Sequence, residues 1–103
     1  SIKNTILDIP IKYLDKYGAV SHQVSELMAL NISKKFNSDI SISCTGISGP
    51  EGGTKEKPVG KVFITIKFFN KIVTKDFIFK VDRNSHRLMT KQAALFMLWT
   101  LIK

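Results

Sequence analysis

The sequence predicts an α/β layer fold with a mixed sheet, in the order helix, helix, strand, glycine-rich loop, strand, strand, helix. Two patterns carry this prediction. Apolar residues recur at helical spacing in three segments, and apolar and polar residues alternate in three others. Helices that precede and follow strands in this way indicate helical layers packed on a sheet. At 103 residues the chain has room for one domain.

The first half of the chain is predicted to hold two helices. Residues 4–17 indicate a turn or two of helix around Pro10, and Gly18 ends that segment. Ser21 is a favourable N-cap for the second helix, which Asn37 is expected to close. Helical spacing predicts that its apolar face consists of Val24, Leu27, Met28, Ile32 and Phe36.

Residues 39–44 are predicted to form the first strand, because apolar and polar residues alternate along them. Ile40, Ile42 and Cys44 share one face, and serines occupy the other. We interpret Cys44 as a buried strand residue, since free cysteine commonly packs as a small hydrophobe and no histidine or acid is spaced to activate it. A single cysteine excludes an internal disulfide and fits a reducing compartment.

The second half is predicted to be a hairpin followed by a helix. The alternating runs 61–69 and 71–80 are joined by a tight link at Asn70-Lys71. Asp82 or Asn84 can cap the last helix. The apolar face of that helix is predicted to be Leu88, Leu95, Leu98, Trp99 and Ile102. Three strands leave one sheet edge without an obvious partner, so the chain is expected to be short of a complete domain at its N-terminus.

The stretch TGISGPEGGTKEKPVG, from Thr45 to Gly60, is predicted to be a binding loop because it holds five of the six glycines. It is much longer than the about two to six residues of an ordinary connection. Successive N–H groups in glycine-rich turns form concave anion sites, so we expect a small molecule that carries a phosphate. Thr45, at the strand end, is expected to offer its hydroxyl to that ligand. The alternative is a purely structural turn.

Two arginines stand out in a lysine-rich chain. Arg83 and Arg87 are four residues apart at a helix start, so both can face one point, where a fork of donors suits a phosphate or carboxylate. The alternative is a pair of solvated charges. His22 and His86 lie far apart in no metal-ligand spacing, so we expect both at the surface and no metal site.

The net charge of +8 raises the question of nucleic-acid binding. The lysines are spread along the whole chain and form no basic block with interleaved aromatics, so no specific nucleic acid is expected. No apolar run approaches the ~20 residues that span a bilayer, and the first residues lack the apolar core of a signal peptide. A cytoplasmic protein without membrane contact is therefore expected.

Two longer motifs resemble the C-terminal domain of the CinA family of bacterial competence/damage-inducible proteins. YGAVSHQVSELMA (Tyr17–Ala29) is similar to the family pattern "GAVS-E-V--MA", and TGISGPEGGTKEKPVGKVFI (Thr45–Ile64) to "TGIAGP-GGT-EKPVG-V-I". VDRNSHR (Val81–Arg87) resembles the "GDR--IR" helix start in part. The resemblance implies a three-layer α/β/α domain, of which residues 1–103 form a part that lacks the N-terminal strand–helix unit.

The resemblance also implies nicotinamide-nucleotide amidohydrolase activity by a serine–lysine dyad, a variant of nucleophilic amide hydrolysis. Lys3 stands seven residues before Pro10, as the active-site lysine of the family precedes its own proline, so Lys3 is the implied catalytic residue. The "ESCTGG" motif that holds the family's serine has no counterpart here, because Ser43-Cys44-Thr45-Gly46 aligns with the later loop. The chain alone is therefore expected to be inactive.

The implied substrate is a nucleotide of the nicotinamide mononucleotide class, with no cofactor. The residues expected to bind it are Thr45, Gly46, Gly49, Gly52, Gly53, Arg83 and Arg87. The candidate protein partners are a second copy in a homodimer or a complementing N-terminal segment. Two alternatives to the enzyme stay open: a non-catalytic nucleotide-binding or interaction module, and a gene remnant.

Overall fold

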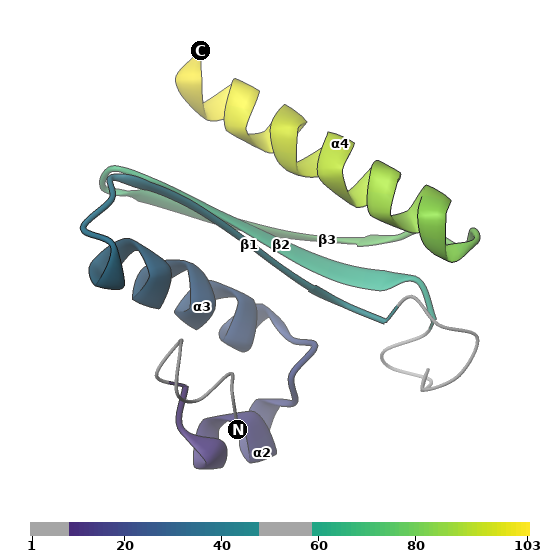
Figure 1. Ribbon diagram of the computed structural model, residues 1–103, viewed down its shortest axis with the longest axis horizontal. Coiled ribbons are helices and arrows are strands. Elements are labelled where there is room, and N and C mark those ends of the chain that lie inside the picture. The colour runs from purple at the N-terminus through teal and green to yellow at the C-terminus, as the bar shows by residue number, and fades with distance from the viewer. Residues whose placement is uncertain (1–8, 48–58) are drawn as a thin grey trace.

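The computed structural model describes residues 9–47 and 59–103. The elements are α2 (Ile11–Tyr17), α3 (His22–Lys35), β1 (Ile40–Gly46), β2 (Lys61–Phe68), β3 (Lys71–Ile78) and α4 (Arg83–Ile102). This is the order that the sequence predicts. Figure 1 shows α2 and α3 on one side of the sheet and α4 on the other. The elements therefore form three layers, as expected of an α/β layer fold.

The sheet has the strand order β1-β2-β3, and both pairings are antiparallel. The prediction of a mixed sheet is wrong for the described residues, because each connection between these strands returns the chain in the opposite direction. The hairpin turn consists of Phe69 and Asn70, one residue earlier than predicted. Phe69 adopts a φ of 57°, and its N–H donates to the carbonyl oxygen of Asp39, which ties the turn to the start of β1.

The helix ends follow the sequence signals closely. The N–H of Gly18, at a φ of 80°, donates to the carbonyl oxygen of Leu14 and ends α2. The Ser21 hydroxyl accepts from the Val24 N–H at 3.2 Å and caps α3. Asn37 follows α3 at a φ of 50°, where a left-handed residue lets the next N–H reach back to the last turn. The predicted helix boundaries at these residues are confirmed.

The buried side of α3 differs from the predicted apolar face. The residues that it buries are Val24, Ser25, Ala29 and Ser33, whereas Phe36 is exposed. This side packs on the serine face of β1, so the polar face of that strand is the buried one. Ser25 Oγ lies 3.2 Å from Ser43 Oγ and 2.8 Å from Thr65 Oγ1. These hydroxyls can be buried because they form hydrogen bonds with one another.

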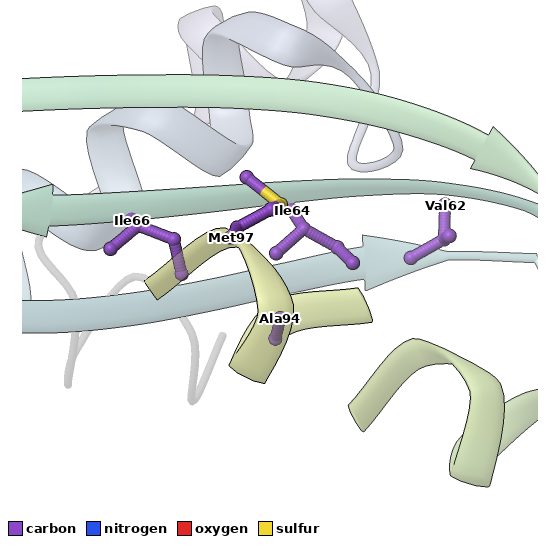
Figure 2. Packing of buried hydrophobic residues seen from close by; sticks show 5 residues of the cluster. All are labelled: Val62, Ile64, Ile66, Ala94 and Met97. Atoms are coloured by element: carbon purple, nitrogen blue, oxygen red, sulfur yellow. The ribbon is translucent and has the colours of Figure 1, made fainter. Parts of the chain in front are cut away.

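The apolar core lies on the opposite face of the sheet, beneath α4. Figure 2 shows its five buried members, which are Val62, Ile64, Ile66, Ala94 and Met97. Phe77 of β3 is partly buried and packs against this cluster. The core is therefore centred on the middle strand, and α4 covers β2 more than it covers β1.

The start of α4 is capped by Asp82, one of the two predicted caps, whose Oδ1 accepts from the Ser85 N–H at 2.9 Å. The predicted apolar face of α4 is wrong, because four of its five members are more than half exposed: Leu88, Leu95, Trp99 and Ile102. The residues that α4 buries are His86, Ala94 and Met97. In the described ranges, no helix is long and apolar enough to cross a membrane.

Candidate functional site

The two ends of the glycine-rich loop are joined by backbone hydrogen bonds among Ile47, Gly60 and Lys61, which we call the neck of the loop. The Ile47 N–H donates to the carbonyl oxygen of Lys61 at 2.9 Å, and the Gly60 N–H donates to the carbonyl oxygen of Ile47. The segment between these ends, with Gly49, Gly52 and Gly53, lies outside the described residues, as does Lys3. What the structure shows of the loop is therefore its base.

Two glycines at this neck occupy positions that larger residues cannot take. A Cβ atom on Gly46 would lie 2.9 Å from the carbonyl oxygen of Lys61. A Cβ atom on Gly60 would lie 2.7 Å from the carbonyl oxygen of Phe79, and Gly60 has a φ of 93°, where side chains are strained. Gly46 is a predicted binding residue, and the close approach of the Lys61 carbonyl oxygen is by itself sufficient to require glycine at this position.

The first turns of α4 are attached to the neck through His86. Its Nε2 lies 3.1 Å from the carbonyl oxygen of Gly60, and its side chain packs edge-on against the Phe79 ring. His86 is only 5% exposed, so the prediction of a surface histidine is wrong. Its helical spacing from the buried Ala94 and Met97 is the sequence signal that identifies it. His22 is exposed, as expected.

Thr45 faces away from the side of the sheet on which α4 lies. It is 8% exposed, and its hydroxyl donates to the carbonyl oxygen of Ala19 at 2.6 Å. This bond ties the connection between α2 and α3 to the end of β1. The expected contact between Thr45 and a ligand stays a prediction, and the hydroxyl proton already has an acceptor inside the protein.

Both predicted arginines are exposed on the first two turns of α4. Neither forms an ion pair within the part of the chain that the structure describes. Arg87 lines a hollow between α4 and β1, next to His86. Its guanidinium is therefore available to an anion that enters this hollow.

The hollow has a volume of about 430 Å³ and lies between the strand ends and the first half of α4. The strands line it with Ile42, Cys44, Gly46 and Val62. The helix lines it with His86, Arg87, Thr90, Lys91, Ala94 and Leu95. Its walls are mainly apolar, and the two cationic side chains come from α4. The arrangement can hold an apolar group beside an anionic one.

Cys44 is exposed in this hollow, so the prediction of a buried strand residue is wrong. The strand alternation was predicted correctly, but the face that carries Cys44 is the less covered one. Partial desolvation raises the pKa of the Cys44 thiol. A protonated thiol is a weak nucleophile, so this residue is not poised for catalysis. Among the described residues, no cluster of histidine, cysteine and carboxylate side chains could hold a metal ion.

Comparisons with known proteins agree on one family. A family model described as the CinA C-terminal domain matches residues 1–102. A CinA-like protein of Cytophaga hutchinsonii is 43% identical over 94 residues, which are 91% of this chain and 22% of that protein. A CinA-like protein of Geotalea uraniireducens is 44% identical over 93 residues, or 90% of this chain and 22% of that protein. The chain thus spans less than a quarter of these relatives.

Solved structures give the same result for the fold. The competence/damage inducible protein of Agrobacterium tumefaciens matches with a TM-score of 0.91 and 33% identity, over 98% of this chain and 62% of that one. An Escherichia coli protein of the competence-damaged protein (CinA) superfamily matches with a TM-score of 0.89 and 31% identity, over 96% of this chain and 58% of that one. Nearly all of this chain therefore has a counterpart, whereas more than a third of each solved chain lies outside the match.

Proposed function

Because the chain belongs to the CinA C-terminal domain family, we propose that it is the nucleotide-holding part of a nicotinamide-nucleotide amidohydrolase domain. In this reaction the amide C–N bond of nicotinamide mononucleotide breaks, water supplies the new oxygen, and nicotinic acid mononucleotide and ammonia leave. The observation that carries the proposal is the bond between His86 and Gly60, which attaches the neck of the glycine-rich loop to the helix that bears Arg87.

The charges around the start of α4 indicate how a nucleotide phosphate would be held. The Asp82 carboxylate already accepts from the Ser85 N–H and hydroxyl, so the helix N-terminus itself is occupied by an anion. The phosphate is therefore assigned to cationic side chains, with Arg87 in the hollow as the main donor and Arg83 one turn earlier. The loop amides between Ile47 and Gly60 complete the proposed binding surface.

The described residues also support the expectation that the chain alone is inactive. The raised pKa of Cys44 keeps its thiol protonated, and the Thr45 hydroxyl donates to a backbone carbonyl rather than to a base. Neither group is activated in the way that a covalent nucleophile requires. In the proposal the serine is supplied from outside this chain, and Lys3 acts as its base.

Titration of the 103-residue chain with nicotinamide mononucleotide, followed by NMR, tests the binding half of the proposal. We expect shifts at Gly46, Gly60 and the first turns of α4. Arg87→Ala should weaken binding about 10- to 150-fold, since a hydrogen bond between charged groups contributes about 1.5–3 kcal/mol and about 1.4 kcal/mol is a factor of ten. Lys103→Ala, at the far end of α4, is the matched control. Nicotinamide riboside, which lacks the phosphate, should bind weakly to both variants.

Two outcomes would contradict the proposal. The absence of any nucleotide-dependent shift would remove the binding role. Release of ammonia from the nucleotide by the chain alone would show that the nucleophile is present after all.

One observation favours the second candidate, an interaction module without catalysis. Large apolar side chains are exposed along α4, as at a protein–protein contact. Ammonia release discriminates the two candidates. A protein that joins this chain to the part of a longer relative that lies outside the match should release ammonia under the first hypothesis and release none under the second.

A further inference from the structure

The end of the sheet opposite the loop neck carries lysines and exposed aromatic rings together. Figure 1 shows the β2–β3 turn and the C-terminal end of α3 at this end of the sheet. The two segments are joined, because the Phe69 N–H donates to the carbonyl oxygen of Asp39 at 2.7 Å and the Ser33 hydroxyl donates to that of Ser38. We call the following side chains of the two segments the hairpin tip: Lys34, Lys35, Phe36, Lys67, Phe69 and Lys71.

Phe69 occupies a backbone position that suits it poorly. It is the first residue of the two-residue turn between β2 and β3, and its φ is 57°. This left-handed region favours glycine and asparagine and is unfavourable for a bulky side chain. The ring is also 52% exposed, and it contacts the Phe68 ring edge-on at a centroid distance of 4.9 Å. A strained backbone that presents an aromatic ring to solvent lowers stability, which indicates a role for this ring outside the fold.

Phe36 extends the apolar surface, and lysines surround it. Phe36 ends α3 and is 67% exposed. The Lys67 ammonium donates to the carbonyl oxygen of Phe69 at 2.9 Å, which holds its charge beside the turn. None of the four lysines of the hairpin tip forms an ion pair with the described residues. Asp39 is the single carboxylate in residues 31–41 and 66–73, so the hairpin tip is cationic.

The chemistry of the hairpin tip identifies its partner. Lysines attract an anionic surface, whereas a second copy of this chain would present the same positive charge to them. Ile72, which follows Lys71 and is 38% exposed, adds apolar area without a ring on which a nucleobase could stack. Apolar side chains among lysines at a turn suit the boundary between lipid headgroups and acyl chains.

We propose that the hairpin tip docks on a bilayer surface that contains anionic phospholipids. Phe36 and Phe69 enter the acyl boundary, and the lysines contact headgroup phosphates. The sequence alone predicts no membrane contact, because these lysines lie in two distant segments that only the fold brings together. Attachment of this kind needs no membrane-spanning helix. It is also independent of the proposed enzymatic function.

Sedimentation with lipid vesicles tests the proposal on the 103-residue chain. Vesicles of phosphatidylglycerol and phosphatidylcholine in equal parts should bind the chain at least about tenfold more tightly than vesicles of phosphatidylcholine alone. Raising the salt concentration from about 0.05 M to about 0.5 M should release the chain, since salt screens the attraction between lysines and headgroups.

A triple substitution tests the lysines of the hairpin tip. It should weaken binding to the mixed vesicles at least about tenfold, and it consists of Lys34→Gln, Lys35→Gln and Lys71→Gln. The matched control removes the same number of charges from exposed positions outside the hairpin tip, by Lys12→Gln, Lys16→Gln and Lys80→Gln. Because the net charge of the two variants is equal, the control should keep most of the binding.

Phe69→Asn separates a role in docking from a role in folding. Asparagine accepts a φ of 57° more readily than phenylalanine does, so the midpoint of thermal unfolding should stay level or rise. Vesicle binding should nevertheless weaken at least about threefold, because the ring no longer enters the acyl boundary. Phe96→Gln is the matched control, since Phe96 is 67% exposed on α4, outside the hairpin tip. That control should bind vesicles as the unaltered chain does.

Four results would overturn the proposal. The first is equal binding to vesicles with and without phosphatidylglycerol. The second is a loss of binding in the control triple variant as large as in the tip variant, since overall charge would then be responsible. The third is a Phe69→Asn variant that binds vesicles as tightly as the unaltered chain. The fourth is release of the chain from the vesicles by a single-stranded oligonucleotide at a lower phosphate concentration than that of the lipid, since the surface would then fit a nucleic acid better.

Discussion

The imidazole Nε2 of His86 lies 3.1 Å from the carbonyl oxygen of Gly60, although 26 residues separate them along the chain. This contact joins the base of the glycine-rich loop to the first turn of the last helix. Both atoms are buried, so water cannot replace either one. The position of α4 relative to the loop is therefore set by a hydrogen bond as well as by the apolar core.

Replacement of His86 is expected to destabilise the protein. His86→Ala leaves the Gly60 carbonyl oxygen without this donor and opens a cavity beside Phe79, at a combined cost of about 2–4 kcal/mol. Urea unfolding followed by circular dichroism measures the change. Thr90→Val removes only the long 3.5 Å contact to Nδ1 and should cost much less. An equal loss in both variants would show that the Gly60 bond contributes nothing specific.

Gly60→Ala is expected to destabilise the loop neck. The added Cβ meets the Phe79 carbonyl oxygen at 2.7 Å, and the φ of 93° is strained for alanine. Backbone strain of this kind costs about 1–3 kcal/mol, and the close contact adds to it. Thermal unfolding should show a lower midpoint, and the amide resonances of Ile47 and Lys61 should shift. A midpoint that stays unchanged would contradict the geometry of the neck.

Ser25→Ala is expected to be costly for so small a change. Thr65, which is fully buried, loses the 2.8 Å hydrogen bond to Ser25 and keeps only the one to Thr74. The loss of one buried hydrogen bond costs about 0.5–1.5 kcal/mol. Ser85→Ala is the control, since its hydroxyl bonds Asp82 at an exposed position. A smaller loss at Ser25 than at Ser85, measured by urea unfolding, would contradict the buried network.

The cap of α4 is expected to contribute to the pH dependence of stability. Hydrogen bonds from the Ser85 N–H and hydroxyl lower the pKa of the Asp82 carboxyl below its ordinary value of 3.8. The pKa of Asp82 is lower in the folded protein than in the unfolded chain. The stability that this cap contributes is therefore fully present above the ordinary pKa and is lost as the pH falls through the lowered pKa. In unfolding curves taken from pH 6 to pH 2, the free energy of unfolding should fall less steeply with decreasing pH (the acid limb) for Asp82→Asn. An acid limb as steep as that of the unaltered chain would count against the prediction.

The thiol of Cys44 is expected to react slowly for an exposed cysteine. Its pKa is raised above the ordinary value of 9.0 by desolvation, so the thiolate fraction at neutral pH is small. Alkylation by iodoacetamide at pH 8 should be slower in the folded chain than in urea, and the folded rate should keep rising above pH 9. Faster alkylation in the folded chain would mean that the thiol is activated rather than suppressed.

The sequence predicts the elements of this fold better than it predicts their buried faces. The order of helices and strands and the caps Ser21 and Asp82 follow from local signals, since each cap bonds a residue three positions away. The buried faces depend on pairing between distant residues. Ser25, Ser43 and Thr65 are buried because their hydroxyls meet across three elements, and no periodicity within one element reveals this.

The candidate site was predicted in part for the same reason. The glycine content identifies the loop and the spacing of the two arginines identifies Arg87, and the structure places Arg87 and Gly46, at the base of the loop, beside the hollow. The prediction misses His86, because its signal is the helical spacing from Ala94 and Met97, and neither of these belongs to the predicted apolar face of α4. The predicted apolar face includes Leu95 and Trp99, which are exposed, because α4 carries apolar residues around most of its circumference. Only the sheet beneath the helix decides which of them are covered.

The hydroxyl network between α3 and the sheet has a consequence for how this chain meets other polypeptides. Hydrogen bonds are directional, so Ser41 and Ser43 fix both the depth and the rotation of β1 on α3. The two bonds hold β1 in one position on α3. A polypeptide that added a strand to this edge would not have to order β1, which would lower the entropic cost of association.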